Sequence, residues 1–253
     1  MMSSERHYNK VAQHAPVQCR QLRRSHNKCK HQLIRRAIEL AQVPLSQCNI
    51  ADLACGRGGD INKIRGCRSY VGADTALHAL AELTRRAAEI QMNVQLHHID
   101  ASRLSILPCS IDVAMCNFAL HYFCDSQQHC SALLDTIERM LRPGGVFCGT
   151  YEKVRGTVSW GTAHYAQIGD CVDALEWRVP WQQLQHMCVA RKMAIVFHMP
   201  FHMIDPEADN SIHSFIIQKA QVQCTDTQPT SSLTTDIPRR RQDEMRCRDQ
   251  SSA

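Results

Sequence analysis

Between residue 49 and about residue 220, short apolar segments alternate with longer segments whose apolar residues recur at helical spacing. This alternation predicts five strands, at 50–54, 69–74, 94–100, 111–117 and 146–151. It also predicts helices at 77–90 and 131–141. Parallel strands need a crossover helix between them, so the pattern is typical of an α/β fold with a doubly wound, mostly parallel sheet.

The later part of the pattern predicts how the sheet ends. A mixed segment at 152–180 is followed by a helix at 181–191. Two further strands, at 193–199 and 211–217, are separated by the short turn DPEADN and predict an antiparallel hairpin at the sheet edge. We therefore expect a Rossmann-like sheet of seven strands whose last strand is antiparallel.

The positive charge of the chain is concentrated at one end. Residues 1–49 contain nine Lys and Arg against two acids, whereas residues 50–220 contain fifteen against seventeen. We divide the chain into a basic N-terminal arm with a first helix (1–48), a main domain (49–220) and a Ser-, Thr-, Gln- and Arg-rich tail (221–253) that we expect to be disordered. The arm suits a polyanion such as nucleic acid, and a solvated basic helix face is the alternative.

We expect neither a membrane protein nor a secreted protein. None reaches the ~18–20 continuous apolar residues of a membrane helix, and the first residues, MMSSERHYNK, lack the apolar region of a secretory signal. The fourteen cysteines are then expected to be free thiols in a reducing compartment. We expect no metal site, because no CxxC pair is present and Pro200 separates the histidines His198 and His202.

The first predicted strand runs into a turn with glycines at 56, 58 and 59. Glycine in such a turn lets backbone amides approach a ligand without a Cβ in the way, and we expect the turn to lead into a helix. Three acids, Asp52, Asp74 and Asp100, stand toward the ends of the first three strands. In a parallel sheet these ends share the carboxyl edge, where such folds bind ligands.

The three acids favour S-adenosylmethionine over a nicotinamide dinucleotide. Asp74 can accept hydrogen bonds from a ribose diol, and Asp100 can accept one from an adenine amino group. Asp52 faces the cationic end of S-adenosylmethionine better than a pyrophosphate, which it would repel. A residue that only caps the turn or the next helix is the alternative for Asp52. The glycine spacing also differs from the G-x-G-x-x-G of nicotinamide enzymes.

Several segments carry a likeness to a known family: His7–Asn9, Leu22–Ile34, Asp52–Asp60, Gly72–Asp74, Cys116–Ser126, Leu141–Thr150 and Val172–Leu184. In this order they resemble the mRNA cap guanine-N7 methyltransferases, a family of class I S-adenosylmethionine-dependent enzymes. The glycine turn alone would indicate only a methyltransferase, whereas ALHY at 119–122 and the basic first helix point to caps. The resemblance implies S-adenosylmethionine as cofactor and capped RNA as substrate.

By this resemblance, eight residues bind the methyl donor. They are Lys30 at the methionine carboxylate, Asp52, Ala54 and Gly56 along the methionine, Asp74 at the ribose, Asp100 at the adenine, and Asn117 and Tyr122 closing over the cofactor.

By the same resemblance, six residues bind the cap, together with segment 152–185. They are His26 and Asn27 in the first helix, Arg57 near the phosphates, His121 and Glu176 at the guanine, and His213 beside the cap. The alternative for Glu176 is a surface or helix-capping glutamate, and the alternative for His121 is a hydrogen-bonded histidine at a strand end.

The chain departs from the family pattern in its first helix, its glycine turn and its last hairpin. Ser25–Lys28 stand where the family has a Phe-Asn-Asn-Trp run, Ala54 replaces a glycine, and the insertion before the last strand is reduced to DPEADN. Arg57 and His213 replace a lysine and a tyrosine. These changes bear on cap affinity more than on cofactor binding.

We predict transfer of a methyl group from S-adenosylmethionine to N7 of the guanosine cap of mRNA. Guanine N7 has a lone pair and no proton to lose, so we expect positioning and electrostatics but no catalytic general base. The alternatives are a methyltransferase for another RNA site or a small molecule, and a non-catalytic RNA-binding subunit. We expect a monomer, intracellular and nuclear rather than cytoplasmic, that works with a triphosphatase and a guanylyltransferase. The basic run at 239–241 would favour nuclear import.

Overall fold

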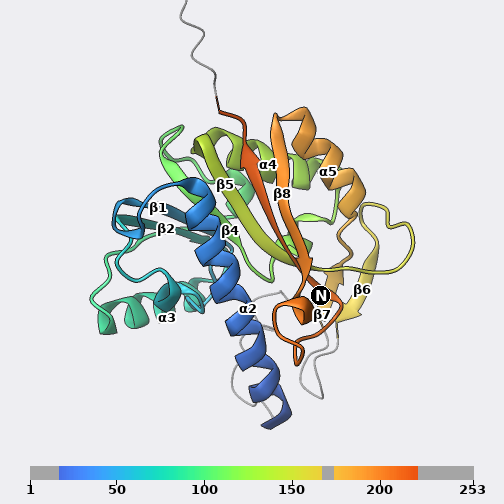
Figure 1. Cartoon of the computed structure of the whole chain (residues 1–253), viewed down its shortest axis with the longest axis horizontal. Coiled ribbons are helices and arrows are strands. Elements are labelled where there is room, and N and C mark those ends of the chain that lie inside the picture. The colour runs from blue at the N-terminus through green and yellow to red at the C-terminus, as the bar shows by residue number, and fades with distance from the viewer. Residues whose placement is uncertain (1–16, 167–173, 222–253) are drawn as a thin grey trace, which may run out of the picture. The chain divides into compact units, whose positions relative to one another are not determined.

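The computed structural model describes residues 17–166 and 174–221, and these are built around one central sheet (Figure 1). The sheet has seven strands in the order β3-β2-β1-β4-β5-β9-β8. The strands are β1 (Asn49–Leu53), β2 (Ser69–Asp74), β3 (Gln95–His98), β4 (Ile111–Cys116), β5 (Leu141–Glu152), β8 (Met193–Pro200) and β9 (Ile212–Lys219). The first five strands pair in parallel, whereas β9 is antiparallel to both of its neighbours, β5 and β8. The predicted mostly parallel sheet with an antiparallel last strand is confirmed.

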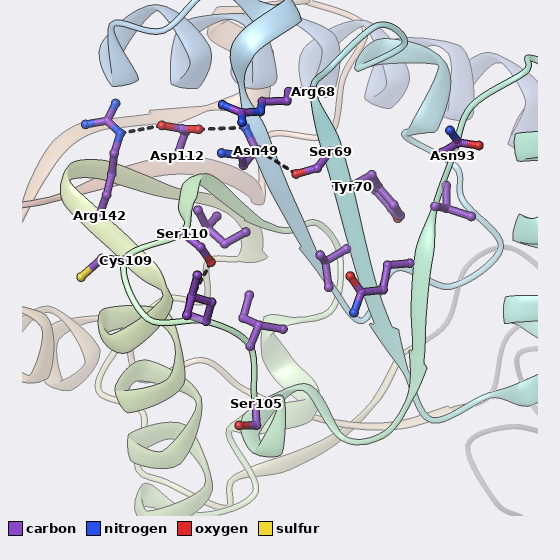
Figure 2. A pocket seen from close by; sticks show the side chains of 16 residues that line it. Asn49, Arg68, Ser69, Tyr70, Asn93, Ser105, Cys109, Ser110, Asp112 and Arg142 are labelled. Carbon is purple, nitrogen blue, oxygen red and sulfur yellow. Dashed lines mark hydrogen bonds and ion pairs between the residues drawn. The ribbon is translucent and has the colours of Figure 1, made fainter.

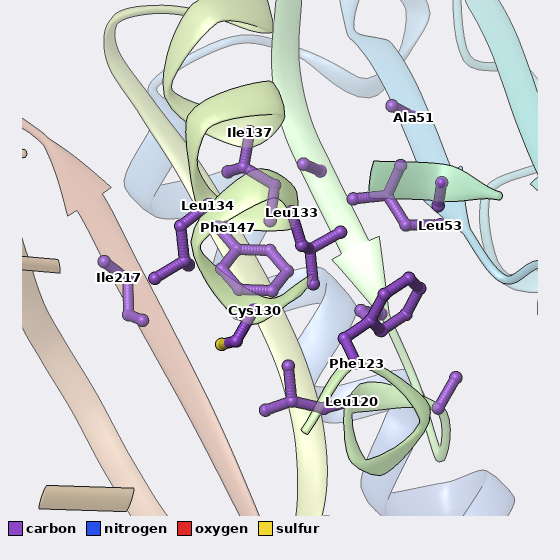
Figure 3. Packing of buried hydrophobic residues seen from close by; sticks show 14 of the residues in the cluster. Ala51, Leu53, Leu120, Phe123, Cys130, Leu133, Leu134, Ile137, Phe147 and Ile217 are labelled. Atoms are coloured by element: carbon purple, nitrogen blue, oxygen red, sulfur yellow. The ribbon is translucent and has the colours of Figure 1, made fainter. Parts of the chain in front are cut away.

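In the described part of the chain, two pairs of α-helices cover the two faces of the sheet. The helices are α2 (Val17–Ala41), α3 (Leu77–Glu89), α4 (Gln127–Met140) and α5 (Trp181–Ala190). Side chains alternate along each strand, so Ile50 packs in a core with α2 and α3, while Ala51 and Leu53 pack in a core with α4 and α5. Figure 3 shows the second core, where Phe147 of β5 lies against Leu133 of α4. All six residues of β4 are buried, as expected for a strand covered on both faces.

Several short segments connect these elements. They include the 3-10 helices η1 (Leu45–Gln47), η2 (Ile61–Lys63), η3 (Ala101–Arg103), η4 (Leu120–Phe123) and η6 (Phe201–Met203). The prediction that the glycine turn leads into a helix is wrong in extent: only the single turn of η2 forms before β2 begins at Ser69. The few residues available, with Gly66 at a φ of +88°, leave no room for an α-helix and the return to the sheet.

The predicted segment 152–185 contains a small sheet of its own. Strands β6 (Ala163–Ala166) and β7 (Ala174–Trp177) pair antiparallel, and this places His164 opposite Glu176 and Tyr165 opposite Leu175. The sequence pattern had indicated only a mixed segment here, because strands of four residues are too short to show a clear period.

Some sequence predictions concern residues outside the described ranges. These are the arm before residue 17, the disorder of the tail and the basic run at 239–241. The domain limits at 48 and 220 stay predictions. Within the described ranges, no helix combines the length and the apolar character that crossing a bilayer demands.

Candidate active site

The glycine turn after β1 is held in place by Asp74, the last residue of β2. The Oδ2 atom of Asp74 accepts a hydrogen bond from the Gly56 amide at 2.7 Å, and Oδ1 accepts one from the Ala76 amide at 2.8 Å. The carboxylate therefore ties the turn to the beginning of α3. Each oxygen keeps a second lone pair, so Asp74 can still accept hydrogen bonds from a ligand such as a vicinal diol.

The turn contains strained backbone at Ala54. This residue has a φ of +58°, in the left-handed region that favours glycine. For the same reason β1 ends at Leu53, one residue before the predicted strand end. Gly56 and Gly58 have φ values of +51° and +70°. Glycine adopts this left-handed conformation without strain.

Replacing Ala54 by glycine should therefore stabilise the protein. We expect Ala54→Gly to raise the free energy of unfolding by about 0.5–1 kcal/mol, because relief of the left-handed strain exceeds the added entropy of the unfolded chain. Urea denaturation of the two proteins measures the difference. The matched change Ala79→Gly, inside α3, should destabilise by a similar amount, and a loss of stability at position 54 would contradict the argument.

Asp100 lies two residues beyond β3 and caps η3, so the prediction that it ends the third strand is wrong by those two residues. Its Oδ1 accepts hydrogen bonds from the Ser102 amide at 2.8 Å and the Ser102 hydroxyl at 2.7 Å, and its Oδ2 lies 3.1 Å from His129 Nε2. Burial would raise the pKa of Asp100, but the bonds from Ser102 and the nearby His129 outweigh it and hold the pKa below its ordinary value. One lone pair on Oδ2 remains for a ligand.

Asp52 differs from the other two acids because it is buried, with 4% of its surface exposed. It points to the face of the sheet that α2 and α3 cover, where the Tyr70 hydroxyl donates to its Oδ2 at 3.0 Å. Burial, together with the negative charge of Asp60, raises the pKa of Asp52 to about 8. The carboxyl group is therefore protonated at neutral pH, until a cation approaches it.

This raised pKa makes stability depend on pH. The unfolded chain ionises Asp52 near pH 4, whereas the folded protein keeps the proton up to about pH 8, so the free energy of unfolding falls as pH rises between these values. Asp52→Asn has no such proton to lose. We expect its Tm to exceed the wild-type Tm by about 5 °C or more at pH 8, and the gap to close toward pH 4. Calorimetric melts across this range measure it, and a gap that does not change with pH would refute the assignment.

A charged network around Asp60 joins α2, the glycine turn and β4. Asp60 Oδ1 lies 2.8 Å from Lys30 Nζ and 2.7 Å from Lys63 Nζ, and its Oδ2 accepts a hydrogen bond from Asn117 Nδ2 at 3.0 Å. Burial would raise the pKa of Asp60, but the two lysines outweigh burial and lower it. Lys63 also donates to Asn27 Oδ1 at 3.0 Å. The network thus connects three residues predicted for the site: Lys30, Asn117 and Asn27.

The charge of the network favours an anion nearby. Two lysines face one ionised carboxylate, and the neighbouring Asp52 is neutral, so one positive charge is in excess. Asn117 Oδ1 is buried without a hydrogen-bond partner, which is costly unless a ligand donates to it. Asp60 and Lys63 were not predicted as site residues. The only signal was the aspartate that follows the glycines, and the contact with Lys30 depends on how α2 crosses the sheet.

His26 packs among aromatic rings beside this network. Its ring stacks on Phe118 with centroids 5.2 Å apart, and Phe201 meets it edge-on at 5.7 Å. Burial lowers the pKa of His26, and its Nε2 atom is buried without a hydrogen-bond partner. Phe118, which follows β4, has a φ of +55°. Backbone strain of this kind is common at functional sites, and here it lies beside the Asp60 network.

A second polar cluster lies between η4 and the small sheet. His121 Nε2 is 3.4 Å from Glu176 Oε1, a contact of opposite polarity that is not aligned as a hydrogen bond. The ring of Tyr122 lies 4.1 Å from that of His121, centroid to centroid. The fold therefore brings His121 and Glu176 together from segments that are far apart in sequence. Their role as guanine contacts stays a prediction.

Three residues of the predicted segment 152–185 that were not predicted individually complete this cluster. Arg178 Nη1 donates to Glu152 Oε2 at 2.5 Å, and His164 Nε2 lies 3.4 Å from the same oxygen. Burial lowers the pKa of His164, and the positive charge of Arg178 lowers it further. His164 and Arg178 were missed because β6 and β7 were not predicted as strands, so nothing in the sequence placed them beside Glu176.

Two other predicted cap residues lie in different surroundings. Arg57 is half-buried within the glycine turn. His213 is buried on β9, where its Nδ1 lies 3.2 Å from His198 Nε2 and its ring lies beside that of Tyr151. Burial and the neighbouring His198 lower the pKa of His213 to about 4, so it stays neutral at physiological pH. Contact of either residue with a cap stays a prediction.

A hollow at the opposite, amino-terminal edge of the sheet contains none of the predicted residues (Figure 2). Its polar groups bond to one another: Asp112 accepts from Arg142 and from the Asn49 amide, and Ser69 donates to Asn49. We interpret these groups as holding the strand starts together. Among the residues that the structure describes, no group of three or more His, Cys, Asp or Glu side chains is arranged to hold a metal ion.

Comparison with curated proteins finds mRNA cap guanine-N(7) methyltransferases. The protein of Caenorhabditis elegans is 30% identical over 174 residues, which cover 59% of this chain and 45% of the relative. Enzyme 1 of Oryza sativa subsp. japonica is 25% identical over 60% of this chain and 55% of its own length. The Schizosaccharomyces pombe protein is 25% identical over 81% and 70%. The chain thus spans about half the length of the first of these relatives.

Comparison with solved structures confirms the fold. An S-adenosylmethionine-dependent methyltransferase from Clostridium acetobutylicum aligns with a TM-score of 0.61 at 12% identity, covering 76% of this chain and 92% of that one. Magnesium protoporphyrin IX methyltransferase from Synechocystis aligns with a TM-score of 0.59 at 11% identity, covering 87% and 92%. A family model described as the mRNA (guanine-N(7))-methyltransferase domain matches residues 3–158, more than half of the chain. The chain therefore belongs to the mRNA (guanine-N(7))-methyltransferase domain family.

Proposed function

We propose that the chain transfers a methyl group from S-adenosylmethionine to N7 of the guanosine cap of mRNA. The observation that carries the proposal, together with family membership, is the contact between His121 and Glu176 at 3.4 Å. Guanine presents two donors, N1–H and the exocyclic amine, and one acceptor, O6. A carboxylate can accept from the two donors, and a neutral or protonated imidazole can donate to O6. Such a pair would reject adenine, whose edge has donor and acceptor in the opposite positions.

The carboxyl edge fits S-adenosylmethionine at both of its ends. Asp74 has free lone pairs for the ribose diol, and Asp100 has one for the adenine amine. At the other end, the excess positive charge of Lys30 and Lys63 suits the methionine carboxylate. The ammonium and sulfonium groups would bring a cation toward the buried Asp52 and favour its ionised form. When bound, S-adenosylmethionine supplies an electrophilic methyl group.

The electrostatics of the second cluster suit the product. The cluster contains two carboxylates, Glu152 and Glu176, and the lowered pKa keeps the neighbouring His164 neutral at pH 7. Guanine becomes cationic when N7 is methylated, so this environment stabilises the charge that develops during transfer.

These residues would act by position alone. Guanine N7 needs no deprotonation, so no side chain has to remove a proton from the nucleophile. What the site must do is hold N7 in line with the methyl group and exclude water, and this can account for a large share of the rate. We extend the proposal to the cell: the chain would act on nuclear transcripts, as a monomer, beside the enzymes that build the cap.

Incubation of the purified protein with radiolabelled methyl donor tests the proposal. GpppA-capped RNA, the same RNA without a cap and a pool of small metabolites are offered in parallel, and the product is digested to nucleosides. We expect label only with capped RNA, at N7 of guanine. Label in uncapped RNA or in a metabolite would assign the chain to another substrate, and binding of capped RNA without transfer would make it a non-catalytic subunit.

A further inference from the structure

One face of α2 carries a row of basic side chains that the candidate active site does not use. Arg24, Lys28, His31 and Arg35 are spaced by four, three and four residues, which places them on a single side of the helix. All four are exposed. At a rise of 1.5 Å per residue the row is about 16 Å long. We call these four residues the outer stripe.

Three residues of the outer stripe, Arg24, Lys28 and Arg35, are cationic. Two acids lie near it, Asp205 at 3.4 Å from Lys28 Nζ and Glu39 at 3.9 Å from Arg35 Nη2. Both contacts are long, and the two basic side chains are 58% and 68% exposed. The Arg35–Glu39 pair is exposed on both sides and contributes little. The Asp205 side chain is only 9% exposed, so it is a firmer partner for Lys28. Lys28 and Arg35 nevertheless keep most of their side-chain surface exposed and can still face another anion.

The outer stripe adjoins the candidate active site. Asn27 sits next to Lys28 on α2 and accepts a hydrogen bond from Lys63, which contacts Asp60. The same helix thus presents Lys30 to the site and the stripe to solvent. Figure 1 shows the N-terminal turns of α2 extending beyond the sheet on the side where β7 lies. A polymer that leaves the site at this end of α2 can follow the helix.

We propose that the outer stripe binds the sugar-phosphate backbone of single-stranded RNA, downstream of the cap. The identification of that RNA as the capped transcript rests on the proposed function. Regularly spaced cations on an exposed face attract successive phosphates irrespective of base sequence. The stripe would hold the transcript while its first nucleotide lies in the site, and so raise affinity for RNA over free cap nucleotides.

The apolar side of α2 argues for RNA rather than an anionic membrane. A helix that lies on a bilayer inserts an apolar face between the lipids. The apolar residues of α2, among them Leu33, Ile34 and Ala37, are instead buried against the sheet. Only the polar face is free, and a face of this kind can bind a soluble polyanion but has nothing to insert.

The test measures binding of a 5′-fluorescein, uncapped 20-nucleotide RNA of mixed sequence by anisotropy, from 50 to 200 mM NaCl. The variant is R24S/K28S/R35S. Each phosphate contact contributes about 0.7 to the slope of log K against log salt, so the loss of three should lower that slope by about 2. Over this salt range the wild-type affinity should fall about 20-fold more than the affinity of the variant.

Two controls keep the result interpretable. R68S/R103S/K192S removes three exposed cations from other parts of the molecule and should leave the slope within experimental error of the wild type. R24K/R35K keeps the charge and should keep the slope, which excludes damage to α2 as the cause. Circular dichroism melts show that each variant is folded.

Each outcome decides the proposal. An unchanged slope in R24S/K28S/R35S, or an equal loss in R68S/R103S/K192S, would overturn it. Stripe-dependent binding to phosphatidylserine vesicles with no binding to RNA would also overturn it and assign the face to membranes. Because the probe has no cap and the assay contains no methyl donor, a failure of the proposed reaction leaves this result unaffected.

Discussion

Asp74→Ala should abolish detectable binding of S-adenosylmethionine, weakening it at least about 100-fold. The substitution removes acceptors for the ribose diol, and hydrogen bonds to a charged group contribute about 1.5–3 kcal/mol each. It also releases the Gly56 and Ala76 amides, so the glycine turn loses the tie that orders it. Isothermal titration calorimetry measures the affinity directly, without any RNA present.

Two further proteins complete this test. Asp135→Ala removes an exposed carboxylate from α4 and should leave cofactor affinity unchanged. Asp74→Asn keeps one oxygen acceptor and should retain an intermediate affinity. Normal affinity in Asp74→Ala would refute the assignment of Asp74 to the ribose of S-adenosylmethionine.

Glu176→Gln should impair the reaction with capped RNA and not the binding of S-adenosylmethionine. We expect kcat/KM for capped RNA to fall by about 10²–10³, because the substitution removes two charge-assisted hydrogen bonds from guanine and a negative charge that favours the methylated base. The Kd for S-adenosylmethionine should stay within about twofold. Steady-state transfer assays and calorimetry on the same preparation separate the two effects.

The matched control for this substitution is Glu138→Gln. Glu138 is an α4 carboxylate near Lys219, half exposed and remote from the small sheet. It should show wild-type kinetics. If Glu176→Gln instead lost cofactor affinity and cap affinity together, the cluster around Glu176 would be part of the methyl-donor site, and the guanine assignment would fail.

The central strands of the sheet were predictable from the sequence because they are buried on both faces. Continuous apolar runs such as 111–117 need no tertiary information to be recognised, and the observed strand, Ile111–Cys116, differs by one residue. The predicted element boundaries were wrong where the backbone conformation is irregular. Ala54 ended β1 early because of its positive φ, and the segment after the glycines had space for one 3-10 turn only.

The candidate site was predictable in part. The alignment of acids at strand ends follows from a parallel topology, and Asp74 and Asp100 lie close to where that argument placed them. The pairing of Asp60 with Lys30 could not be predicted, since it depends on the path of α2 across the sheet. His164 was missed for a related reason: its position opposite Glu176 is set by a pairing between two four-residue strands.

The position of β9 has a consequence for synthesis on the ribosome. This strand is inserted between β5 and β8, so β8 joins the sheet only through a strand that is translated after it. A nascent chain released at residue 200 would expose one side of β5 and leave β8 without a neighbour. Completion of the domain therefore waits until Lys219 has left the exit tunnel, and the emerging β5 is open to misassociation or chaperone capture until then.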